Sequence, residues 1–258
     1  MSFRTSDEDL RETGDVLSAV AFDRDTTATT FRTDPDWVRS ILPPCFEPDP
    51  AGTAAVSIGH WKWLDGLSHH PEFNCAAVNV AVSRNATPGW YNIAMYLDDE
   101  FGTVFGRELW GESKKLAHIA YDPQTGAARV TRDGVEIIST TGSPTRTVAP
   151  YDTTAVGWEV RGLLHPAGTG ILGDVWLTTI AADESGTKTA LESPTLTLTS
   201  TPNDALGDIP LLSIEGATRF VAERSAWHPD EPTPLPDTAA YLPFLLGRDF
   251  DPFTTGAV

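Results

Sequence analysis

Two adjacent lysines, Lys114 and Lys115, are the residues of this sequence best suited to carbonyl chemistry. The chain has four lysines among its 258 residues, and the other two, Lys62 and Lys188, stand alone. An amine attacks a ketone only when it is neutral, so an apolar pocket or a neighbouring ammonium must lower its pKa from the usual value of about 10.4. Taken alone, a Lys-Lys pair is most often part of a solvated surface, and it assigns no function.

Two other motifs suggest different chemistry. His69, His70 and Glu72 have metal-ligand side chains, with His60 upstream. Adjacent residues on a strand or loop point in opposite directions and no further ligand cluster follows, so we interpret this segment as an exposed polar loop. Residues 168–173 match the GxGxxG pattern, but the residues that follow are typical of a strand, whereas a dinucleotide site needs a helix there. The sequence predicts a glycine-rich loop and no metal site.

The charge of the chain excludes several classes of partner. Asp and Glu total 36 against 18 Lys and Arg, which gives a formal net charge of −18. Such a surface repels phosphate backbones and anionic lipids, so we expect neither nucleic acid nor membrane as a partner. The acidic, polar start of the sequence lacks a signal peptide pattern, and no apolar run is long enough to span a bilayer. We therefore expect a cytoplasmic protein, in which Cys45 and Cys75 act as small apolar residues.

Strand patterns dominate the chain. Residues 75–82 and 91–97 are rich in residues that favour strands, and Asp133-Gly134 between alternating runs is a strong hairpin signal. Residues 173–180 and 194–199 continue the two-residue period. A short helix is expected after Asp34-Pro35, and weaker helical patterns cover residues 214–224 and 238–246.

These elements predict a mainly β protein with minor α content. Many short strands with Pro- and Gly-rich connections favour a closed, conical antiparallel β-barrel with a few flanking helices. Residues 1–15 offer no apolar face, and we expect a flexible acidic arm there. Residues 16–258 are expected to form a single domain.

Several collinear blocks resemble one family. The most specific is MYLDDEFGTVFGRELWGESKKLA at residues 95–117, and weaker matches lie at residues 31–44, 71–80 and 193–223. On these blocks the chain, from Arg24 through Glu223, resembles the acetoacetate decarboxylase family. The resemblance implies an acetoacetate decarboxylase-like barrel.

The resemblance also implies roles for individual residues. Lys114 would be the lysine that forms a Schiff base, with Lys115 as its companion. Arg24 aligns with the family's carboxylate-binding arginine, and Glu72 with a glutamate that orients groups near the imine. Both are expected at the barrel mouth, and we expect Trp110 to help shape the substrate pocket. A protonated imine is itself an electron sink, so no metal or organic cofactor is expected.

Two departures from the family pattern leave the reaction open. The resemblance places another active-site glutamate of the family at or beside Ser57, where this chain has Val56, Ser57 and Ile58, and Ser113 stands in place of the family's proline before the lysine pair. Decarboxylation of a small β-keto acid through a lysine imine and enamine is the first hypothesis. An aldolase-dehydratase or cyclase of specialised metabolism that uses the same lysine is the second, and a barrel that binds a carbonyl ligand without turnover is the third. The resemblance further implies a homo-oligomer.

Overall fold

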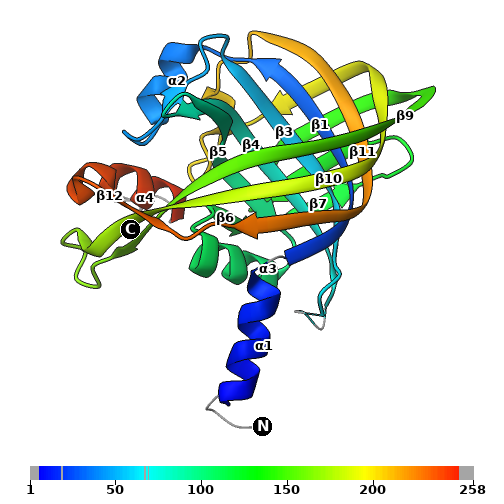
Figure 1. Cartoon of the computed structure of the whole chain (residues 1–258). Coiled ribbons are helices and arrows are strands. Elements are labelled where there is room, and N and C mark those ends of the chain that lie inside the picture. Colours follow the sequence, from blue (N-terminus) through cyan, green and yellow to red (C-terminus); the bar gives the residue numbers. More distant parts are fainter. Residues whose placement is uncertain (1–5, 19, 67, 69, 250–258) are drawn as a thin grey trace.

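The structure is a computed structural model, and it describes residues 6–18, 20–66, 68 and 70–249. Seven long strands form its main sheet (Figure 1): β1 (Val20–Arg32), β3 (Thr53–Trp63), β4 (Glu72–Arg84), β5 (Thr87–Leu97), β9 (Val135–Leu164), β10 (Ile171–Leu198) and β11 (Ser213–Pro229). Five short strands extend it: β2 (Glu47–Pro48), β6 (Lys114–Leu116), β7 (His118–Tyr121), β8 (Ala128–Arg132) and β12 (Thr233–Leu235).

The long strands pair in a closed ring. Their order is β10-β11-β1-β3-β4-β5-β9, and β9 pairs in turn with β10. Neighbours are antiparallel except at one seam, where Trp90 and Tyr91 of β5 pair in parallel with Gly157 and Trp158 of β9. The predicted mainly β, acetoacetate decarboxylase-like fold is confirmed, with this parallel seam as a difference from the all-antiparallel arrangement we expected.

Helices are few and lie at the edges of the sheet (Figure 1): α1 (Asp7–Leu17), α2 (Pro35–Ile41), α3 (Glu100–Phe105), the π-helix η1 (Gly106–Trp110), the 3-10 helices η2 (Leu206–Asp208) and η3 (Thr238–Tyr241), and α4 (Leu242–Asp249). Helix α2 begins as predicted, because the Asp34 side chain accepts a hydrogen bond from the Asp36 amide and Pro35 occupies the first turn. No helix among the described residues is long and apolar enough to cross a membrane.

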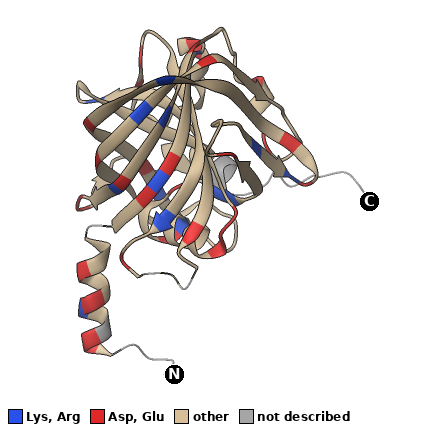
Figure 2. Ribbon diagram, turned by 90° about the vertical axis from the view of Figure 1, so that its right-hand side faces the viewer, with Lys and Arg blue, Asp and Glu red and all other residues tan. Residues whose placement is uncertain are grey.

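Two sequence predictions of local structure are corrected. Residues 214–224, expected to be helical, lie in β11, because pairing with β1 on one edge and β10 on the other outweighs a weak helical pattern. Of residues 1–15, expected to be a flexible arm, residues 1–5 lie outside the described residues, and residues 7–15 belong to α1, which projects from the ring (Figure 1). Acidic residues in its first turn stabilise this helix, because their negative charges lie near the positive end of the helix dipole. Figure 2 shows acidic residues as red bands along the helix.

Other local predictions are confirmed. Asp133 and Gly134 both have positive φ, at 52° and 79°, and connect β8 to β9 in the tight hairpin that Asp-Gly favours. The glycine-rich residues 168–173 lie where β9 returns into β10, with no helix after them. This segment is therefore a loop and the start of a strand.

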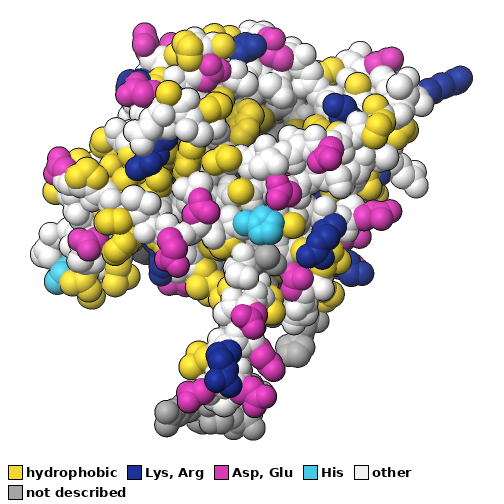
Figure 3. Space-filling model, viewed as in Figure 1, with side chains coloured by type: hydrophobic (Ala, Val, Ile, Leu, Met, Phe, Trp, Pro, Cys, Tyr) yellow, Lys and Arg dark blue, Asp and Glu magenta, His cyan; other side chains and the backbone are white. Residues whose placement is uncertain are grey.

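The ring separates two apolar regions. Side chains alternate along each strand, so Ala76 and Val78 of β4 belong to the larger core outside the ring, under α2 and α4. Cys75 and Ala77 belong instead to a smaller, aromatic-rich cluster inside it. Many acidic side chains lie on the surface, and Figure 3 shows them scattered over one face among apolar groups, but Glu112, Glu159, Glu184 and Asp204 are buried. The interior is therefore the place for a site.

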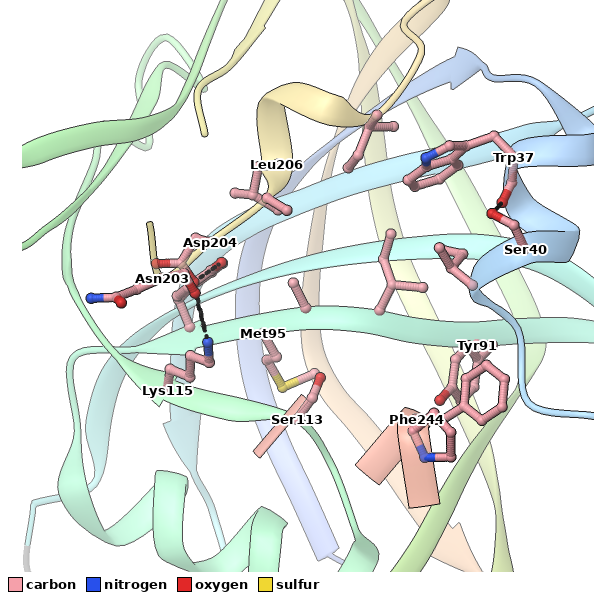
Figure 4. A pocket seen from close by; sticks show the side chains of 17 residues that line it. Trp37, Ser40, Tyr91, Met95, Ser113, Lys115, Asn203, Asp204, Leu206 and Phe244 are labelled. Carbon is pink, nitrogen blue, oxygen red and sulfur yellow. Dashed lines mark hydrogen bonds and ion pairs between the residues drawn. The ribbon is translucent and has the colours of Figure 1, made fainter. Parts of the chain in front are cut away.

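A buried carboxylate fixes β6 and the segment that precedes η2. Asp204 accepts a hydrogen bond from the Tyr96 hydroxyl (2.9 Å) and pairs with Lys115 Nζ at 3.4 Å and with an Arg132 guanidinium nitrogen at 2.6 Å. These partners come from β5, β6 and β8, so one side chain joins three strands. Figure 4 shows the Lys115 and Asp204 side chains in contact where both line a pocket of about 450 Å³.

We predict that Asp204→Asn destabilises the protein by about 3–5 kcal/mol, because it removes the carboxylate from two largely buried cations. The free energy of unfolding in urea is the measurement. Asp208→Asn is the matched control, since Asp208 lies in the same segment but is exposed, and its cost should stay within about 0.5 kcal/mol. Equal effects of the two substitutions would contradict this role of Asp204.

Candidate functional site

The ring encloses two connected chambers. The inner one, here called the lysine chamber, has a volume of about 150 Å³, and Lys114, Arg24, Trp110, Trp63 and Cys75 are among its lining residues. The outer chamber measures about 500 Å³. The two share the following lining residues: Arg24, Ser57, Asn79, Met95, Glu112 and Trp227.

Lys114 lies at the wall of the lysine chamber with its side chain 9% exposed. Its Nζ lies 2.7 Å from Oε2 of Glu112, whose side chain is 3% exposed. The contact is an ion pair whose alignment does not meet hydrogen-bond geometry, so Oε2 remains a buried acceptor without a hydrogen bond. An amine and a carboxylate therefore meet in a closed apolar space.

Aromatic side chains pack around this space. Trp110 stacks on Trp227 with ring centres 5.9 Å apart and meets Phe105 edge to face at 5.0 Å. Burial raises the pKa of the Cys75 thiol, which also lines the chamber, to about 12. The chamber thus penalises a thiolate strongly.

Arg24 of β1 also lines the lysine chamber. A guanidinium nitrogen pairs with Glu184 of β10 at 2.7 Å, and the guanidinium lies 5.1 Å from the centre of the Trp61 ring. Its Nε is buried and has no hydrogen-bond partner among the described residues. Arg24 therefore retains a donor group with which to bind a carboxylate or carbonyl oxygen.

Lys115 and Glu72 do not line either chamber. Residues 112 and 114 face the interior, and by the alternation of a strand Lys115 points to the outer face, toward Asp204 and the Asn203 carbonyl. On β4 the odd-numbered residues Phe73, Cys75 and Ala77 face the lysine chamber.

Glu72 is even-numbered and lies on the other face of β4. Its side chain is 58% exposed, and its Oε1 lies 3.7 Å from Lys62 Nζ. The structure thus brings Lys114, Arg24 and Trp110 together at one chamber, and it places Lys115 and Glu72 outside both chambers.

The two family departures lie close to the site. Ser57 lines both chambers. Ser113 points away from them, and its hydroxyl donates to the Asn92 side chain at 3.0 Å, which in turn donates to Asn79 at 3.3 Å. The Ser57 side chain therefore lies at the chambers, and a chain of polar side chains begins at Ser113.

Sequence reasoning missed Glu112 and Glu184. Glu112 precedes Lys114 by two residues, and in extended chain this spacing places both on one face, so the signal was present. Glu184 comes from β10, 160 residues from Arg24, and nothing local in the sequence marks it. No group of three potential metal ligands lies close together in the described part of the chain, which leaves out His69.

Comparisons with known proteins agree with this architecture. The family model described as acetoacetate decarboxylase matches residues 10–230. Acetoacetate decarboxylases of Burkholderia multivorans and Paraburkholderia phytofirmans are 39% and 38% identical to this chain over 95 and 89 residues. These matches cover 37% and 34% of this chain, and the same shares of the relatives' own lengths.

Solved structures resemble the whole fold at low identity. The enduracididine biosynthesis enzyme MppR aligns with a TM-score of 0.69 at 15% identity, over 86% of this chain and 88% of its own. Acetoacetate decarboxylase from Legionella pneumophila aligns with a TM-score of 0.69 at 18% identity, over 84% and 87%. These likenesses establish the fold, and with the family match over residues 10–230 they show that the chain belongs to the acetoacetate decarboxylase family.

Proposed function

We propose that the protein is a Schiff-base-forming lyase that decarboxylates a small β-keto acid through Lys114. The observation that carries this proposal is the burial of the Lys114 amine in a small aromatic chamber that Arg24 also lines. The family to which the chain belongs, and its acetoacetate decarboxylase-like fold, support lyase chemistry at this position.

In the proposed reaction, the neutral Lys114 amine adds to the ketone carbon, and loss of water together with gain of one proton gives a protonated imine. The bond between the α-carbon and the carboxylate then breaks, and its electron pair moves toward the imine nitrogen to give an enamine and carbon dioxide. Protonation of the enamine carbon and hydrolysis release the ketone and the free lysine. The imine is the electron sink, so the proposed steps call for no metal or organic cofactor.

Arg24 would hold the carboxylate of the bound keto acid. Its buried Nε is a donor without a partner, and a charged donor forms a strong hydrogen bond with a carboxylate oxygen. Trp61 packs against the guanidinium and Glu184 pairs with it, so Arg24 is already positioned before a substrate enters.

An aldolase-dehydratase or cyclase that uses the same lysine is the second candidate. The outer chamber, at about 500 Å³, has more room than a four-carbon acid needs. The structural neighbour MppR has been solved with pyruvate and with the condensation product of pyruvate and imidazole 4-carboxaldehyde. A larger acceptor substrate in the outer chamber would extend this chemistry to the present protein.

Borohydride trapping tests the Schiff base. Incubation with acetoacetate, and separately with pyruvate, followed by reduction should leave an adduct on Lys114, located by peptide mass spectrometry. Lys114→Ala should abolish both adduct and turnover while circular dichroism shows the fold retained. Lys188→Ala is the control, because Lys188 is exposed. Turnover by Lys114→Ala at the normal rate would refute the mechanism, and absence of any adduct would favour a non-catalytic carbonyl-binding protein.

Arg24→Lys should raise the KM for the trapped keto acid roughly tenfold to a hundredfold, in line with about 1.5–3 kcal/mol for a hydrogen bond to a charged group. The substitution keeps a positive charge beside Glu184 but removes the Nε donor. Steady-state kinetics measure the change. Arg129→Lys, at a side chain that is 71% exposed, should leave KM as it is. An unchanged KM in Arg24→Lys would place the carboxylate elsewhere.

The Cys75 thiol reports whether the chamber is dry. With a pKa of about 12, a fraction of roughly 10⁻⁴ of this thiol is ionised at pH 8, so iodoacetamide should alkylate it very slowly in the folded protein. Labelling followed by intact mass and peptide mapping measures the rate, and urea should release the thiol for rapid labelling. Fast labelling of native Cys75 would show an open, wet chamber.

A further inference from the structure

Glu112 is the carboxylate that contacts the Lys114 amine, and the sequence resemblance assigns it no role. Its Oε2 lies 2.7 Å from Nζ, and both side chains are more than nine-tenths buried. Oε2 makes no hydrogen bond that would hold it away from the amine. The pair lines the lysine chamber, where the reacting carbonyl of the proposed function would lie.

The backbone around Gly106 is shaped to hold this pair. A Cβ at Gly106 would lie 2.2 Å from Glu112 Oε2 and 2.5 Å from Lys114 Nζ, so any larger residue would displace both groups. The Glu112 amide donates to the Gly106 carbonyl at 3.1 Å, and the Lys114 amide donates to the Glu112 carbonyl at 2.9 Å. Gly111, at φ 81°, turns the chain between the end of η1 and Glu112.

This arrangement sets a chemical requirement. An adjacent carboxylate favours the ammonium form of a lysine, and an ammonium has no lone pair with which to attack a ketone. The proton must leave before a Schiff base forms. A base in contact with the ammonium can accept that proton without a solvent molecule entering the chamber.

We propose that Glu112 is the proton relay of Lys114, an inference that rests on the proposed function. Glu112 takes the ammonium proton, which leaves a neutral amine and a neutral acid. As the N–C bond forms and the carbonyl π bond breaks, the new alkoxide takes the proton from Glu112. The nitrogen, now positive, returns a proton to the carboxylate. Glu112 delivers it to the hydroxyl as the C–O bond breaks, so water leaves and the nitrogen lone pair completes the imine.

Glu112 would thereby supply an acid and base that the chain lacks at Ser57. The titratable and charged side chains that line the two chambers with it are Arg24, Cys75, Lys114, Glu159, Glu184 and Glu215. Glu184 pairs with Arg24, and Glu215 pairs with Arg32 at 3.6 Å. Glu112 is the carboxylate that pairs with Lys114.

The test compares single-turnover imine formation, trapped by borohydride on Lys114, in the wild-type protein and in Glu112→Gln. Loss of the relay should slow trapping roughly 10²- to 10⁴-fold, the usual contribution of a general acid or base. Glu112→Asp should recover part of the rate, and higher pH should partly restore Glu112→Gln because hydroxide removes the ammonium proton. A merely structural role predicts none of this pH rescue. Glu108→Gln is the matched control, since Glu108 is exposed on the same segment.

Gly106→Ala provides a second variant that keeps both reacting groups. It should slow trapping as well, because the added methyl group separates the amine from the carboxylate, whereas Gly14→Ala meets no atom within 4 Å and should not. Trapping at the wild-type rate in a folded Glu112→Gln protein would overturn the relay and leave the Schiff base intact. Absence of any wild-type adduct with β-keto acids would overturn the proposed function, and the relay with it.

Discussion

Strand β6 and the two residues before it present successive side chains to opposite faces of the sheet, and the arrangement of the site depends on this alternation. Glu112 and Lys114 face the enclosed chamber, while Ser113 and Lys115 face the outer side. A slip of one residue would exchange the two sets. Asp204 opposes such a slip, because its carboxylate engages Lys115 together with side chains of β5 and β8.

Because of the same alternation, Lys114 and Lys115 pair with different carboxylates on opposite faces of the sheet. Lys115 is held by a buried carboxylate in a network outside the ring, where it stabilises structure. Lys114 meets its carboxylate inside a chamber that has room for a ligand. The family resemblance alone suggests that one ammonium acts on the other, but the geometry directs them to different partners. In the proposed mechanism, activation of Lys114 would then come from its own surroundings, namely the aromatic walls and Glu112.

Much of the fold was predictable from sequence because its signals are local. The Asp34-Pro35 helix start, the Asp133-Gly134 turn and the strands of β4 and β5 each follow from residues within a few positions. Residues 214–224 were not predictable in this way, since pairing on both edges decides that β11 is a strand. In the site, the resemblance pointed to Lys114 and Arg24, which line one chamber, and to Glu72, whose exposed side chain lies outside both chambers. Strand register decides which face of β4 a residue occupies, and no local signal in the sequence fixes it.

The charges of the chambers bear on why a keto acid would lose its carboxylate there. Arg24 and Lys114 each have a carboxylate partner already, Glu184 and Glu112. A bound keto acid would bring one more negative charge into a space that strongly disfavours the Cys75 thiolate. The Nε of Arg24 offers it one donor, which orients the carboxylate without neutralising a free cation. Departure as carbon dioxide removes that charge, while the electrons move to an imine nitrogen that carries positive charge. Loss of carbon dioxide thus removes both the negative charge of the carboxylate and the positive charge of the imine. Apolar surroundings favour a step that removes charge, so the aromatic lining would assist this step as well as imine formation.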